Sequence, residues 1–276
     1  MEMYLAELLQ KDRPFSLRML HSLSTLDVLV LAPHPDDFDT VGLTMRFLKA
    51  NHNRISVVVM RTAGGVEDAF CSPPTREAKT AIREEEQRQS CRFFGLKDED
   101  LAFLSMEQDE QEEPILTSRN LAAVEDVMLK RRPNLVFIPH GNDTNSGHRT
   151  VHAIFNRIAA ASGFPVVAFL NRDPKTISMR TDCFTEFGEE EAQWKSRLLR
   201  FHASQHQRNL NIRNRGFDER ILDVNRATAR ELGLNEEYAE AFELELHGAG
   251  AEAVAEAESA TFTVDHVCRE KEQLNA

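Results

Sequence analysis

The feature that most constrains the fold is an apolar, β-branched run at residues 27–31 that ends in His34-Pro35-Asp36-Asp37. A short run of this kind, bounded by turn residues, is typical of a strand buried in a sheet. In a parallel α/β sheet, ligands bind at the carboxyl ends of the strands, where loops and helix N-termini converge. Histidine and aspartate are nitrogen and oxygen ligands that suit zinc. The run therefore predicts a strand that leads directly into a metal site.

The rest of the chain alternates between strand and helix patterns. Expected strands cover residues 55–60, 101–104, 135–139 and 165–170, and expected helices cover residues 40–51, 75–94, 116–130, 147–161 and 192–209. Residues 238–246 fit either a short strand or a short helix. This alternation favours an α/β fold with a Rossmann-like, mostly parallel sheet and helices on both of its faces.

The domain organisation is expected to be simple. A chain of 276 residues can bury the core of one large α/β domain, and no linker or internal repeat divides it. We expect one domain over residues 1–246, with a lead-in helix in residues 1–25. Residues 247–276 are rich in alanine and glutamate and are expected to form a C-terminal extension.

Composition excludes several classes of function. The net charge of -12 argues against binding of nucleic acid, which needs clustered lysine and arginine. The apolar runs are shorter than the roughly 18 residues that a membrane span requires. Four cysteines without C-x-x-C spacing indicate reduced thiols rather than disulfides or a cysteine metal cage. The N-terminal residues have no signal-peptide core, so we expect a cytoplasmic protein.

A second polar segment, residues 139–152, follows the expected strand at residues 135–139. It contains the pattern Asp143-Thr144-Asn145-Ser146-Gly147-His148-Arg149-Thr150. Because the carboxyl ends of neighbouring parallel strands meet at one edge of a sheet, this segment is expected to face the first motif.

Together, the two motifs resemble those of the zinc-dependent de-N-acetylases of the PIG-L/LmbE family. Weaker matches lie at residues 83–86, 202–205 and 238–242, so the resemblance spans roughly residues 27–246. It implies a hydrolase that removes an N-acetyl group from an N-acetylglucosamine-type sugar or sugar conjugate. The expected partner is thus a small N-acetylated sugar, and a homo-oligomer is compatible with the sequence.

The resemblance also implies roles for particular residues. It makes His34, Asp37 and His148 the ligands of one zinc ion, and Asp36 the general base. Three protein ligands leave a coordination position open for water, and zinc lowers the pKa of that water to about 7. A site with two histidines and one aspartate also accepts other divalent metals. By spacing alone, His152 competes with His148, but the motif favours His148.

Five further positions follow from the same resemblance. Asn145 stands where many relatives have a histidine credited with stabilising the oxyanion, and its amide can still donate a hydrogen bond. Arg83, Asp109 and Asp143 are the expected contacts to substrate. Phe38 follows the first motif at a position where the family often has glutamate.

Other interpretations remain open at this point. Phe38 and Asn145 are compatible with a catalytically silent homologue that binds a sugar without hydrolysing it. An amidase that cleaves a thiol–sugar conjugate is a variant within the enzyme class. A dinucleotide-binding module is disfavoured, because no G-x-G-x-x-G pattern follows the first strand.

Overall fold

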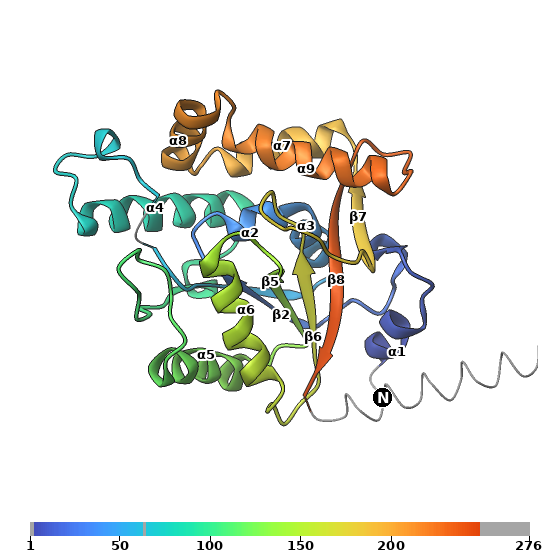
Figure 1. Cartoon of the computed structure of the whole chain (residues 1–276). Helices are drawn as coiled ribbons and strands as arrows, with labels where there is room; N and C mark the ends of the chain where they lie inside the picture. Colours follow the sequence, from blue (N-terminus) through green and yellow to red (C-terminus); the bar gives the residue numbers. More distant parts are fainter. Residues whose placement is uncertain (1–2, 63–64, 249–276) are drawn as a thin grey trace, which may run out of the picture.

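A single eight-stranded mixed sheet organises the computed structural model, which describes residues 3–62 and 65–248 (Figure 1). The strands are β1 (Phe15–Ser16), β2 (Asp27–Ala32), β3 (Arg54–Val59), β4 (Leu101–Phe103), β5 (Leu135–Pro139), β6 (Val166–Asn171), β7 (Cys183–Phe187) and β8 (Tyr238–His247). Their order in the sheet is β1-β7-β8-β6-β5-β2-β3-β4. This arrangement confirms the predicted α/β class.

The middle of the sheet is parallel, and this brings the two predicted motifs together. β2 pairs in parallel with β3 on one side and with β5 on the other, so that Val30 lies opposite both Val57 and Phe137. β6 continues the parallel part beside β5. β8 is antiparallel to both β6 and β7. The carboxyl ends of β2, β5 and β6 therefore lie along the same edge.

Helices cover both faces of the sheet (Figure 1). They are α1 (Met3–Gln10), α2 (Asp37–Thr40), α3 (Gly42–Ala50), α4 (Arg76–Phe94), α5 (Ser118–Arg131), α6 (Ser146–Ala159), α7 (Glu189–Leu199), α8 (Ala203–Arg213) and α9 (Phe217–Glu231). As predicted, α4 ends at Phe94, and it is followed by Gly95, whose φ of 89° is in the left-handed region that glycine tolerates. In the described residues, no helix is both long and apolar enough to cross a bilayer.

Alternating residues of β2 divide the core into two parts. Leu29 and Leu31 pack in the cluster that contains the buried side chains of α5 and α6. Val28 and Val30 belong to the opposite cluster, which includes buried residues of α1, α3, α4 and α7. Successive side chains of a strand point to opposite faces of the sheet. Because residues 28–32 of β2 are all apolar and buried, β2 is covered on both faces, as expected for the centre of a parallel sheet.

The structure differs from the predicted elements mainly after residue 180. The helix expected over residues 192–209 is interrupted, because His202 has a non-helical ψ of 62° and begins a new helix, α8. β7 and α9 were not predicted, and residues 238–246 are a strand. Within the lead-in segment, only Met3–Gln10 is α-helical. Most of the predicted C-terminal extension, residues 249–276, lies outside the described residues.

In Figure 1, α7, α8 and α9 lie together at the top of the view, and the arrow of β6 points toward them. These C-terminal helices therefore lie beyond the carboxyl end of β6.

Candidate active site

The turn from β2 to α2 separates two adjacent carboxylates. Asp36 has a φ of 113°, a left-handed conformation that is unusual for a residue with a side chain. Its backbone N–H donates to Oε1 of Gln87 on α4 at 2.9 Å, which helps to hold this conformation. Strained backbone of this kind is concentrated at functional sites. Asp36 and Asp37 consequently contact different partners, although they are neighbours in the sequence.

The structure brings the three predicted metal ligands together. His34, Asp37 and His148 each offer one ligand atom, and these atoms all lie within 4.8 Å of one another. Oδ1 of Asp37 lies 3.6 Å from Nε2 of His148, and Oδ2 of Asp37 lies 3.3 Å from Nδ1 of His34. Two imidazoles and one carboxylate around a common point suit a divalent cation such as zinc.

Asp143 contacts the ring nitrogen of His148 that faces away from Asp37. Nδ1 of the buried His148 lies 3.1 Å from Oδ2 of Asp143, and its Nε2 faces Asp37. A histidine that ligates a metal usually donates its other N–H group to such a carboxylate. Burial lowers the pKa of His148, but Asp37 and Asp143 outweigh burial and raise this pKa to about 9. The potential of the site therefore favours a positive charge, as a metal centre requires.

Glu113 gives similar support to His34, and the sequence analysis did not single it out. Oε2 of Glu113 lies 3.7 Å from Nε2 of His34 and, although buried, it has no hydrogen-bond partner among the described residues. Its other oxygen accepts from Arg61 at 2.7 Å. Burial raises the pKa of Glu113, but His34 and Arg61 lower it to about 2. A carboxylate held ionised here can orient the His34 ring.

Arg83 contacts the predicted general base. Its Nη2 donates to Oδ2 of Asp36 at 2.9 Å and also to the backbone oxygen of Pro35. The side chain of Arg83 is only 3% exposed. Arg83 lines the cavity, as a substrate contact would, but its hydrogen bonds make it a positioning residue for Asp36.

Asn145 is oriented by the start of α6. Its Oδ1 accepts from the backbone N–H of Gly147 at 2.9 Å, and it caps the helix in this way. With the oxygen engaged, the Nδ2 group is left as a donor at the cavity wall. Asp143 accepts from the Asn145 backbone N–H at 2.6 Å. The substrate contact expected of Asp143 does not fit this geometry, because Asp143 is occupied with Asn145 and His148.

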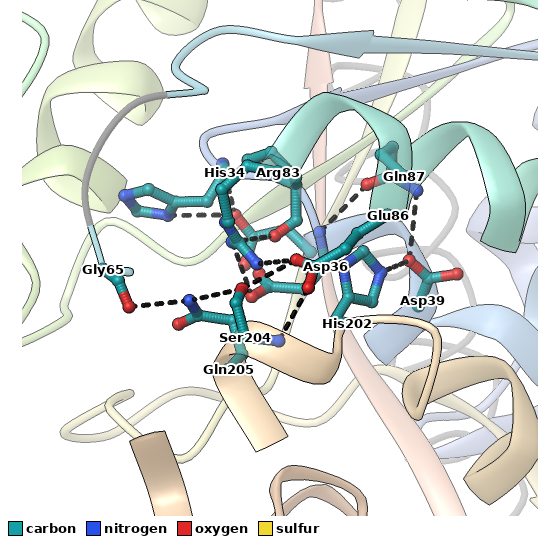
Figure 2. Close-up of polar contacts among 12 residues, drawn as sticks. His34, Asp36, Asp39, Gly65, Arg83, Glu86, Gln87, His202, Ser204 and Gln205 are labelled. Carbon is teal, nitrogen blue, oxygen red and sulfur yellow. Dashed lines mark hydrogen bonds and ion pairs between the residues drawn. The ribbon is translucent and has the colours of Figure 1, made fainter. Parts of the chain in front are cut away.

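A buried network joins the first motif to α4 and α8 (Figure 2). Oδ2 of Asp39 lies 2.6 Å from Nε2 of His202 and accepts from Gln87 at 3.1 Å. Glu86 accepts from the backbone and the hydroxyl of Ser204 at 2.6 and 2.7 Å. Residues 202–205 therefore fasten the start of α8 beneath the site. Phe38 points away from this network into the core, edge-on to the ring of Phe94.

Asp109 and His152 lie elsewhere. The Asp109 carboxylate accepts from the backbone N–H groups of Gln111 and Glu113 at 2.9 and 2.8 Å. It thus shapes the turn that carries Glu113 and does not contact the cavity as a substrate ligand would. His152 lies 3.9 Å from Glu245, a residue of β8, and is apart from the three predicted ligands.

A cavity of about 430 Å³ connects these groups. One wall carries His34, Asp36, Asp37, Asn145 and His148. The other wall comes from α8, α9 and the loop after β6. It contributes Asp173, Lys175, Arg208, Arg213, Phe217, Arg220 and Ile221.

The comparisons with known proteins agree with this fold. The family model described as GlcNAc-PI de-N-acetylase, PIG-L, matches residues 29–159, which include both motifs. No curated protein matches the chain.

Several solved structures share the fold. The N,N'-diacetylchitobiose deacetylase from Pyrococcus horikoshii is 18% identical, with a TM-score of 0.64 over 79% of this chain and 83% of that chain. The 4-carboxy-2-hydroxymuconate hydratase from Pseudomonas putida is 20% identical, with a TM-score of 0.60 over 79% and 95%. The zinc-inhibited form of a teicoplanin deacetylase is 12% identical, with a TM-score of 0.59 over 81% and 99%. At these identities the likeness establishes the fold.

Proposed function

Because this chain carries a PIG-L (GlcNAc-PI de-N-acetylase) family domain, we propose that it is a metal-dependent hydrolase of N-acetylglucosamine-type sugars or sugar conjugates. It would remove the N-acetyl group and release acetate. The observation that carries the proposal is the convergence of His34, Asp37 and His148, beside Asp36 and Asn145, in one cavity.

The donor set fits a divalent metal, with zinc as the proposed ion. His34, Asp37 and His148 would hold it, while Glu113 and Asp143 keep the two imidazoles oriented. When bound, zinc supplies an acidified water and polarises the amide carbonyl. The buried Oε2 of Glu113 has no hydrogen-bond partner among the described residues and lies 3.7 Å from the ring of His34, so a negative charge adjoins the proposed cation site.

The protein's own side chains would carry out the proton transfers and stabilise the developing charge. Asp36, held by Arg83, accepts a proton from the attacking water as the new C–O bond forms. Nδ2 of Asn145 donates a hydrogen bond to the carbonyl oxygen as negative charge develops there. Asp36 then passes the proton to the sugar nitrogen while the C–N bond breaks. Acetate and the free amine are the products.

The fold does not select this reaction by itself, since one of the similar structures is a hydratase. The selection rests on the site. A catalytically silent sugar binder would not require a carboxylate held in a strained backbone conformation beside a metal-ligand cluster. Cleavage of a thiol–sugar amide would use the same groups and differs only in what surrounds the amide.

The test combines metal content with acetate release from a panel of N-acetylglucosamine derivatives, each measured with and without a chelator. We expect about one metal ion per chain and release that the chelator abolishes and zinc restores. His152→Ala is the matched control and should retain the metal. Failure of the purified chain to bind any divalent metal would overturn the proposal.

A further inference from the structure

The α8–α9 wall of the cavity is strongly basic, although the chain as a whole has a net charge of -12. Arg208 and Arg213 come from α8, and Arg220 comes from the second turn of α9. Lys175 lines the same cavity from the loop that follows β6. Four cations thus face the space in which the substrate of the proposed reaction would lie.

Arg208, Arg213 and Arg220 form no salt bridge within the part of the chain that the structure describes. None of the ion pairs or side-chain hydrogen bonds formed by described residues involves Arg208, Arg213 or Arg220. Two neighbouring arginines that do not line the cavity are paired: Arg200 with Asp218 at 2.7 Å, and Arg215 with Asp223 at 2.6 Å. The cavity wall therefore carries three arginines whose charges no salt bridge within the described residues neutralises.

Arg220 shows that the basic wall reaches the reacting groups. It is half-buried, and burial together with the neighbouring Arg213 lowers its pKa, while Asp173 and Asp36 act in the opposite direction. Arg220 therefore interacts electrostatically both with Asp36 of the opposite wall and with the other arginines. An anion placed beside Arg220 would counteract its burial and the repulsion from Arg213, which Asp173 and Asp36 only partly offset.

We propose that Arg208, Arg213 and Arg220 form an anion subsite, so that the preferred substrate is an N-acetylated sugar carrying a phosphate or carboxylate group. Guanidinium groups bind both kinds of oxyanion through paired hydrogen bonds. This proposal rests on the deacetylase function proposed above and specifies its substrate class. The size of the cavity fits a small molecule, and its location within a pocket distinguishes it from a nucleic-acid surface.

The first arm of the test compares substrates on the metal-loaded full chain. N-acetylglucosamine 6-phosphate and 1-phosphate carry phosphate, N-acetylmuramic acid carries a carboxylate, and N-acetylglucosamine and N,N'-diacetylchitobiose are neutral. We expect kcat/KM for at least one anionic sugar to exceed that for both neutral sugars by about tenfold or more, and added salt to reduce the difference. The better of the two anion types identifies the group that the arginines select.

The second arm removes single charges. Arg213→Gln and Arg220→Gln should each reduce the ratio of anionic to neutral kcat/KM about tenfold, mainly through KM. Arg230→Gln is the matched control, because Arg230 lies near the end of the same helix α9, is exposed, and does not line the cavity. It should keep the wild-type ratio. Equal kcat/KM for anionic and neutral sugars in the wild type would overturn the subsite and leave the deacetylase function intact.

A binding measurement separates the two proposals if no sugar is hydrolysed. Inorganic phosphate is titrated into the wild-type chain and the same three variants by calorimetry. Saturable binding that weakens about tenfold in Arg213→Gln and Arg220→Gln, but not in Arg230→Gln, would support the subsite even though the deacetylase function had failed. Phosphate binding that is absent, or equal in all four proteins, would overturn the subsite.

Discussion

At the scale of single residues, Asp36 and Asp37 illustrate how backbone conformation assigns roles. The left-handed φ of Asp36 turns its carboxylate to Arg83, whereas Asp37 faces His34 and His148. Two identical side chains next to each other thereby acquire separate tasks, one as proton acceptor and one as metal ligand, in the function that we propose.

This division predicts different losses for two substitutions. Asp36→Asn should lower the rate of acetate release by about 10²–10⁴-fold, the usual contribution of a general base, and leave the metal content unchanged. His148→Ala should lose the metal itself, because a ligand is removed. Metal analysis of the dialysed proteins beside the acetate assay separates the two effects. Equal metal loss in both variants would contradict the assignment of Asp36 as the base.

Phe38 gives a second prediction at this scale. Phe38 is fully buried and packs edge-on against Phe94. Phe38→Glu should therefore reduce the free energy of unfolding by more than about 3 kcal/mol, since it places an unpaired carboxylate in the core. Denaturant unfolding measures this change. Leu129→Glu, at a site that is 62% exposed, is the control and should change stability by less than about 1 kcal/mol.

At the scale of elements, one buried lysine connects four of them. Nζ of Lys195, on α7, donates to the backbone oxygen of Thr40 at 2.6 Å, to Asn225 at 2.8 Å and to Glu240 at 2.6 Å. These partners lie on α2, α9 and β8. Glu240 also accepts from the backbone N–H of Leu43 at 3.0 Å, at the start of α3. The ion pair of Lys195 with Glu240 thus connects the C-terminal helices to the segment that follows the predicted metal-binding motif.

Lys195→Met should destabilise the protein by about 3–5 kcal/mol, because it leaves the carboxylate of Glu240 buried without a counter-ion. Chemical denaturation monitored by circular dichroism tests this value. The exposed pair of Arg54 with Asp27, at 2.6 Å, provides the comparison, and Arg54→Gln should cost no more than about 1 kcal/mol. A similar small loss in both variants would show that the buried pair does not hold these elements together.

At the scale of the whole molecule, two buried carboxylates predict how stability depends on pH. Burial raises the pKa of Asp218, but hydrogen bonds from Ser196 and Arg200 outweigh it, so this pKa lies below its usual 3.8. Burial likewise raises the pKa of Asp182, and a hydrogen bond from Arg180 outweighs it. Both groups are ionised more readily in the folded chain than in the unfolded chain.

A lowered pKa in the folded state means that the unfolded chain takes up protons first as the pH falls. The stability that Asp182 and Asp218 contribute is therefore fully present above about pH 5 and is lost below about pH 4, as the pH approaches their folded-state pKa values. Urea unfolding at a series of pH values measures the slope. Asp218→Asn should flatten it, and an unchanged slope in this variant would contradict the stated role of Asp218.

The sequence alone determined the features that depend on short stretches of chain. Apolar runs located β2, β3, β5 and β6, and the helix pattern over residues 75–94 located α4. Two polar motifs were placed after neighbouring strands, and their resemblance to a known family implied that His34, Asp37 and His148 should meet. These inferences hold because strand periodicity, helix capping and the parallel order of strands are set by neighbouring residues and by general rules of sheets.

Only the tertiary structure decided what surrounds those residues. The break before α8 depends on His202 reaching Asp39, and Glu113 is placed beside His34 by a turn distant from it in sequence. Arg213 and Arg220 look like ordinary solvated helix residues until α8 and α9 are folded over the ends of the strands. Such contacts join distant parts of the chain, so their energies have no local signature in the sequence.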